Sequence, residues 1–135
     1  MIMVEKVVFK AFSIYIILGL FIYPVFHQGG SIGYLLTPNF GYLLGVYPLI
    51  KIIDNLNTRN KINVGDFLKK GIIAIGVMHL TGIFYNFIQV IFYSEFNIFL
   101  YNLGKYSVGK IGYHFLMLFP LLLLIKPIKN LIQSK

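Results

Sequence analysis

The sequence contains no cysteine and only four acidic residues. The absence of cysteine excludes disulfide bonds, thiolate metal sites and a cysteine nucleophile. Because Glu5, Asp54, Asp66 and Glu95 all lie outside the apolar centres of the chain, no carboxylate pair is placed for acid–base catalysis. A glycine-rich phosphate loop ending in Lys-Ser or Lys-Thr is also missing, so any ATP would be bound by another protein. We therefore predict no enzymatic activity, no catalytic residue and no cofactor.

Histidine is nearly as scarce. The chain has three histidines, His27, His79 and His114. No two of them are four residues apart, and no acidic residue lies beside them in the sequence. Zinc sites on helices commonly use two histidines at that spacing. The sequence therefore predicts no metal site.

Charge is low and apolar content is high. Charged residues make up 12% of the 135 residues, apolar residues 58%, and the mean hydropathy is +0.79. Soluble domains contain about 25% charged and 45–50% apolar residues, so we expect this chain to sit in lipid. The net charge of +8 comes from Lys and Arg clusters between the apolar runs, which is typical of membrane-flanking segments and not of a nucleic-acid interface.

The apolar runs predict an all-α fold, an integral membrane bundle of about four transmembrane helices in a single domain, 1–135. Crossing about 30 Å of hydrocarbon takes roughly 20 helical residues. The predicted helices cover about residues 7–23, 40–53, 71–93 and 106–125, and the third carries no formal charge. Residues 96–103 are apolar but too short to cross, so they form either an interfacial piece or the lead-in to the last helix.

The positions of Lys and Arg predict the orientation in the membrane, since these residues concentrate in cytoplasmic loops. Lys6 and Lys10 precede the first helix, the polar connector 54–70 is basic, and Lys residues follow the last helix, whereas loop 27–38 has none. We expect a multi-pass protein of the plasma membrane with both termini and the connector in the cytoplasm. The glycine-rich loop then faces outside. The first apolar run ends in bulky residues and not in a cleavage site, which favours a retained helix.

Two groups of residues are candidates for binding a small molecule. The segment from Phe26 to Tyr42 combines four glycines with Tyr34, Thr37 and Asn39, and it either forms a simple outer hairpin or lines a pocket. His79, Tyr85, Asn86 and Gln89 place hydrogen-bonding groups within the charge-free helix, where they either mark a substrate path or join helices to one another. His114, near the start of the last helix, is a third candidate.

One ordered block resembles the BioY family. It runs from Gly19 to Gly45 and contains Pro24-Val25-Phe26, the pair Gly29-Gly30 and the pattern Pro-x-x-Gly-Tyr-x-x-Gly that starts at Pro38. A weaker similarity covers His79-Leu80-Thr81-Gly82-Ile83-Phe84-Tyr85. BioY proteins are the biotin-binding substrate components of energy-coupling factor transporters.

The resemblance implies a six-helix membrane component that captures biotin from outside and works with a coupling transmembrane subunit and two ATPase subunits. By analogy, Phe26, Gly30, Tyr34, Asn39 and Tyr42 would build one wall of the ligand pocket. The polar candidates His79, Tyr85 and His114 complete the set of expected ligand-binding residues. Asn39 is the expected polar contact to the ureido ring, because an amide both donates and accepts hydrogen bonds.

The sequence departs from the family pattern in two places. The chain looks like the last four helices, as if the first two were missing. Many members also carry a Gly-Asp-x-x-Lys motif for the ligand in the last helix, where this chain has Gly112-Tyr113-His114-Phe115-Leu116-Met117. His114 replaces the Asp and no Lys follows, so the charge pair of the family is gone although a neutral histidine can still hydrogen-bond.

Three alternatives to a biotin-binding component stay open. The chain could transport another small vitamin-like molecule, or it could be a truncated or degenerate membrane protein with a structural role. A membrane-embedded enzyme that uses His79 or His114 is the third, and it lacks partner residues for these histidines.

Overall fold

The computed structural model describes residues 2–26, 29–57, 64–93, 96–121 and 123–124. Within these ranges the regular structure is helical, which confirms the all-α fold class. The elements are α1 (Ile2–Phe21), the 3₁₀ helix η1 (Ile32–Leu36), α2 (Pro38–Leu44), α3 (Val46–Asn57), α4 (Val64–Tyr93), α5 (Phe96–Asn102), the π-helix η2 (Leu103–Val108) and α6 (Gly109–Leu116).

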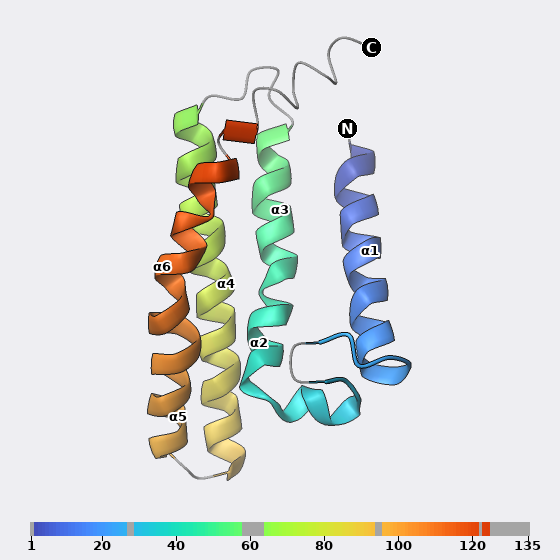
Figure 1. Cartoon of the computed structure of the whole chain (residues 1–135), viewed down its shortest axis with the longest axis vertical. Helices are drawn as coiled ribbons and strands as arrows, with labels where there is room; N and C mark the ends of the chain where they lie inside the picture. Colours follow the sequence, from blue (N-terminus) through green and yellow to red (C-terminus); the bar gives the residue numbers. More distant parts are fainter. Residues whose placement is uncertain (1, 27–28, 58–63, 94–95, 122, 125–135) are drawn as a thin grey trace.

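The helices stand side by side as an up-and-down bundle (Figure 1). α2 continues into α3, and α5 continues through η2 into α6, so that α1, α2–α3, α4 and α5–α6 run in alternating directions. α4 is the central element, because it contacts α2, α3, α5, η2 and α6, whereas α1 packs mainly on α3 and η1. The described part of the segment between α1 and α2 therefore lies at the end of the bundle where α4 ends and α5 begins.

The helices are longer than the apolar runs predicted. α1 covers Ile2–Phe21 instead of 7–23, α4 begins at Val64 instead of 71, and the last predicted helix begins at Phe96 instead of 106. Most of the predicted connector 54–70 is helical as well. The physical reason is that hydropathy finds only the part of a helix that suits lipid, while Lys and other good helix formers extend the helix beyond it. The segment 96–103 is the lead-in to the last helix.

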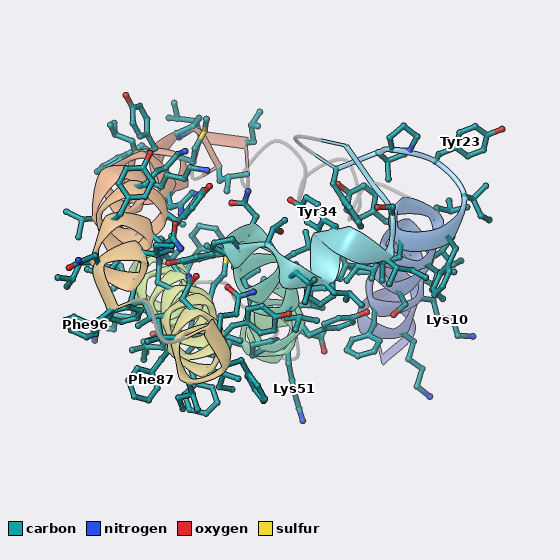
Figure 2. All side chains as sticks on the ribbon, turned by 90° about the horizontal axis from the view of Figure 1, so that it is seen from below. Lys10, Tyr23, Tyr34, Lys51, Phe87 and Phe96 are labelled. Atoms are coloured by element: carbon teal, nitrogen blue, oxygen red, sulfur yellow. The ribbon has the colours of Figure 1, made fainter. Side chains whose placement is uncertain are left out.

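α4 is long and apolar enough to cross a membrane by length and composition: Gly65–Phe92 is 28 residues long with a hydropathy of 1.7. It is the one helix of the described part that meets this criterion, since α1 carries Glu5, Lys6 and Lys10 and the other helices are shorter. Large apolar side chains point away from the bundle along its length, such as Phe92, which is 78% exposed. Figure 2, seen along the bundle from the loop end, shows Phe87 of α4 and Phe96 of α5 on the outer surface of the bundle.

α2 packs directly against α4 at two glycines that lie one turn apart. A Cβ atom on Gly41 would lie 2.3 Å from Cβ of Tyr85, and one on Gly45 would lie 2.6 Å from the carbonyl oxygen of Met78. Small residues at this spacing let two helix backbones approach closely in a membrane. The close approach places Tyr42, which lies between these glycines, against α4.

Candidate functional site

An aromatic cluster lies beneath the loop between α1 and α2. Phe26 and Tyr34 are buried there with Phe40 and Ile16, and the ring centroids of Phe26 and Tyr34 are 4.5 Å apart. Tyr34 lies between α1 and α2 (Figure 2). Burial raises the pKa of the Tyr34 phenol above its usual value of 10.0, with smaller effects from neighbouring tyrosines, so its hydroxyl stays protonated. Phe26 and Tyr34 are thus part of the core that holds the loop in place.

α4 fixes the end of this loop through two side chains. The hydroxyl of Tyr85 donates a hydrogen bond to the carbonyl oxygen of Leu35, and Gln89 Nε2 donates to the carbonyl oxygen of Leu36 at 2.9 Å. The loop therefore does not form a free outer hairpin. It is bound to the central helix at the position where α2 begins.

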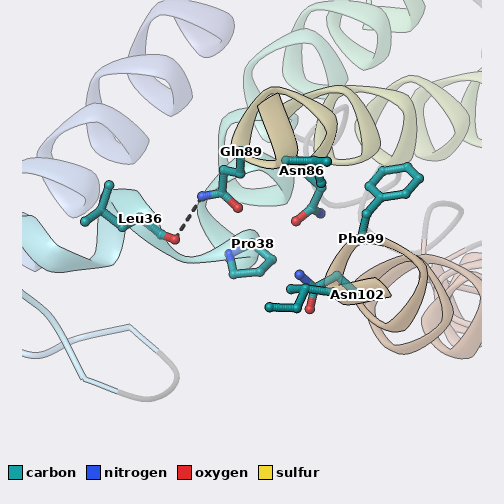
Figure 3. Close-up of a pocket in the computed structure, with 8 residues that line it drawn as sticks. Leu36, Pro38, Asn86, Gln89, Phe99 and Asn102 are labelled. Carbon is teal, nitrogen blue, oxygen red and sulfur yellow. Dashed lines mark hydrogen bonds between the residues drawn. The ribbon is translucent and has the colours of Figure 1, made fainter. Parts of the chain in front are cut away.

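A cavity of about 140 Å³ opens beside this attachment, between the loop, α4 and α5 (Figure 3). Polar and apolar side chains both line it. The lining residues are Leu36, Pro38, Asn86, Gln89, Val90, Ile98, Phe99 and Asn102.

Asn86 is the most unusual residue of the cavity wall. Its side chain is 2% exposed, and Nδ2 donates to the carbonyl oxygen of Gly82 at 3.1 Å. Its Oδ1 is buried without a hydrogen-bond partner. A buried acceptor left unpaired costs about 1–3 kcal/mol, so a ligand that brings a donor to Asn86 recovers this free energy.

A second polar cluster lies deeper in the bundle and joins three helical columns. Ser107 Oγ is 2.7 Å from the hydroxyl of Tyr42 and 3.3 Å from His79 Nδ1, and His79 Nε2 is 2.9 Å from His114 Nδ1. Ser107 belongs to the π-helix η2, whose wider turn changes the register of the column. Ser107 and His79 are both buried.

The residues predicted as a single ligand site thus separate into distinct groups. Tyr42, His79 and His114 come together in the deeper cluster, whereas Tyr85 binds the loop. Gly30 packs near Gly19 and Pro24 on the side of α1, away from the cavity.

Asn39 lies next to the cavity without being one of its lining residues. It follows the lining residue Pro38 at the start of α2, and its side chain is half-buried.

Asn102 and Ser107 were not recognised in the sequence, because no pattern in the 96–111 stretch distinguishes a polar residue that turns inward from one that faces outward. Asn86 and Gln89 were visible as polar positions on the helical face of His79, but nothing in the sequence placed them at a cavity. Among the residues that the structure describes, no group of three or more His, Cys, Asp or Glu side chains is placed to hold a metal ion.

Comparison with known families decides the classification. The family model described as the BioY family matches residues 1–122. The chain belongs to the BioY family. This confirms the resemblance seen in the block from Gly19 to Gly45, and BioY proteins are membrane-embedded substrate components for biotin-type uptake, not enzymes. No curated protein and no solved structure matches the chain.

Proposed function

We propose that this BioY protein binds biotin in the cavity beside Asn86 and acts as the substrate-binding component of an energy-coupling factor transporter. The observation that carries the proposal is the buried, unpartnered Oδ1 of Asn86 in the wall of that cavity. An acceptor in this position matches a ligand whose ring carries N–H donors, and the ureido ring of biotin has two.

The cavity suits the bicyclic head of biotin better than the whole molecule. Sites that enclose a complete small ligand start at about 300 Å³, and this cavity measures about 140 Å³. The ureido group would face Asn86 and Asn102, and the sulfur-containing ring would contact apolar side chains such as Ile98 and Phe99. The valerate tail would then extend towards the mouth of the cavity at Leu36.

Asn39 is a second proposed contact. It lies next to Pro38 in the cavity wall, so a small rotation at the start of α2 would bring its amide to the ligand. Tyr42, His79 and His114 are proposed to act beneath the cavity, and Tyr85 to hold the loop against α4.

Energy for uptake would come from other proteins. We propose that two ATPase subunits and a coupling transmembrane subunit bind this protein on the cytoplasmic side, since the chain has no phosphate loop. Both termini would be cytoplasmic in the plasma membrane, and the loop between α1 and α2 would face outside, where the ligand enters.

Calorimetric titration of the purified protein in lipid nanodiscs with biotin tests the proposal. Asn86→Ala should weaken binding by about 1–3 kcal/mol, or about 5- to 150-fold, because the ligand loses a buried acceptor. Phe84→Ala is the matched control, since Phe84 lies on the exposed side of the same helix, and it should bind as wild type. Asn39→Ala shows whether the second contact exists.

Absence of saturable biotin binding to the wild type would contradict the proposed substrate. The same titration with other small vitamin-like molecules would then identify the ligand. This alternative is specific, because His114 stands where many family members carry the Asp of their ligand motif. Equal binding by wild type and Asn86→Ala would place the ligand away from this cavity.

A further inference from the structure

Two lysines lie halfway along the bundle, at the depth where the apolar span of α4 has its middle. His79 is at the centre of that span, Gly65–Phe92, and Ser107 Oγ lies 3.3 Å from His79 Nδ1. Lys105 precedes Ser107 by two residues, and Lys110 follows it by three. At about 1.5 Å per residue, both lysines are therefore within about 5 Å of the middle of the span along its axis.

Both lysine side chains are exposed. The column α5–η2–α6 that carries them stands at the edge of the bundle and packs mainly on α4 (Figure 1). Lipid would therefore surround the lysines if no other protein covered them. A charged Lys at the centre of a bilayer is strongly unfavourable, and its four-carbon stem is much shorter than the roughly 15 Å from the centre to the edge of the hydrocarbon.

The described part of the chain places no carboxylate at this depth. Three of the four acidic residues lie towards the end of the bundle opposite the loop between α1 and α2: Glu5, Asp54 and Asp66. Asp66 is thirteen residues from His79, about 20 Å along the axis. Glu95 lies outside the described residues, and Lys105 follows it by ten positions, most of them in α5. A counter-ion for the two lysines must then come from another molecule.

The ring of Tyr106 lies close to both ammonium groups. Its centroid is 5.3 Å from Nζ of Lys105 and 5.2 Å from Nζ of Lys110. Lys105 Nζ is also 5.4 Å from the centroid of Tyr101. An aromatic ring attracts a cation but carries no net charge to neutralise it. Two positive charges that share one ring also repel each other, so the arrangement favours an anion beside them.

The same column is bare of side chains directly before each lysine. Gly104 precedes Lys105 and Gly109 precedes Lys110, and the N–H of Gly109 donates to the carbonyl oxygen of Gly104 one π-turn earlier. Both glycines are exposed. A Cβ on Gly104 would meet no atom within 4 Å, and one on Gly109 would meet only that carbonyl oxygen, at 3.2 Å. Exposed glycines one turn apart let another helix approach the backbone closely.

Charge decides what kind of molecule can cover this face. A second copy would bring its own lysines to the face and, from its described part, no carboxylate at the same depth. Lipid phosphates stay at the surface, roughly 15 Å away. An acidic side chain on a transmembrane helix of another protein reaches the required depth and has the opposite charge.

From these observations we propose that the face around Lys105 and Lys110 is a docking surface for a transmembrane helix of a different protein, which carries an Asp or Glu near its middle. The partner helix packs on Gly104 and Gly109, and its carboxylate accepts hydrogen bonds from the two lysines. Neither lysine lines the Asn86 cavity, so the proposal is independent of biotin binding.

A designed transmembrane peptide tests the charge requirement. The probe is a polyleucine helix of about 20 residues with one Glu at its centre, and its control is the same peptide with Gln. Energy transfer in liposomes, from a dye on Ile32→Cys to a dye on the peptide, measures association at a low ratio of peptide to lipid. The protein should bind the Glu peptide about 10-fold more tightly, because hydrogen bonds between charged groups are stronger than neutral ones.

Variants of the lysines show whether this face causes the preference. Lys105→Met with Lys110→Met should abolish it, because Met keeps the length of the side chain and removes the charge. Lys105→Arg with Lys110→Arg should retain it. Lys51→Met with Lys69→Met is the matched control, since these exposed lysines belong to α3 and α4, and it should bind as wild type.

Equal binding of the Glu and Gln peptides would overturn the proposal, and this comparison uses only the wild-type face. A preference for Glu that survives in the double Met variant would overturn it as well. Energy transfer between two labelled copies of the protein that the Glu peptide abolishes would identify a second copy as the occupant and refute a different protein.

Crosslinking in the native membrane tests for the partner itself. A photo-crosslinking amino acid at Val108, which is 67% exposed on the same column, should attach to a transmembrane segment of another protein within one turn of an Asp or Glu. The double Met variant should lose this product. Crosslinks to lipid alone, or to segments without an acidic residue, would overturn the proposal.

Discussion

α2 and α4 touch backbone to backbone at Gly41, so this position tests whether close helix packing organises the site. In Gly41→Ala the new methyl group would lie 2.3 Å from Cβ of Tyr85. That atom is attached directly to the backbone, so no side-chain rotation can relieve the contact, and α2 must move away from α4. The movement would also loosen the bond from Tyr85 to the carbonyl oxygen of Leu35.

The expected loss of stability follows from these two effects. Overpacking of a tight interface costs about 1–3 kcal/mol, and a weakened hydrogen bond costs up to about 1 kcal/mol. We expect Gly41→Ala to lose about 2–3 kcal/mol. Gly76→Ala is the matched control, because Gly76 lies within α4 and a Cβ there meets no atom within 4 Å. It should gain about 0.5–1 kcal/mol from better helix propensity.

Unfolding of each variant in detergent micelles by increasing SDS, followed by circular dichroism, gives the free energies to compare. The same samples should be titrated with biotin, since displacement of α2 moves Pro38 in the cavity wall. If Gly41→Ala is as stable as Gly76→Ala, then α2 and α4 are not in close contact and the placement of Tyr42 against α4 is wrong.

Two further predictions concern the loop between α1 and α2. Ser31 has φ 111° and ψ 167°, a conformation that strains any residue with a side chain, so Ser31→Gly should stabilise the protein by about 1 kcal/mol in the same unfolding assay; a loss of stability would show that the serine is not strained. The absence of native cysteine permits single-cysteine labelling: a membrane-impermeant maleimide added to intact cells should react with Ile32→Cys and not with Lys69→Cys. The reverse pattern would put the loop in the cytoplasm and remove the proposed route of entry.

The sequence alone determined the fold class, because long apolar runs have few structural solutions in lipid and the backbone must satisfy its own hydrogen bonds there. It also determined the family, since Pro38, Gly41, Tyr42 and Gly45 occur at set spacings in one local block. Gly41 and Gly45 have a packing role in the fold, and their spacing of four residues within an apolar segment is typical of such helix contacts.

Only the tertiary structure decided which polar residues share a site. Asn86 and Asn102 lie on different helices and meet at one cavity, and His79 and His114 are 35 residues apart yet share a hydrogen bond. The register between antiparallel helices decides such pairings, and a π-helix within one of them shifts that register without any clear signal in the sequence. The burial of Phe26 and Tyr34 also depends on tertiary structure, because their core partners Ile16 and Phe40 come from α1 and α2; their role at the ligand stays a prediction.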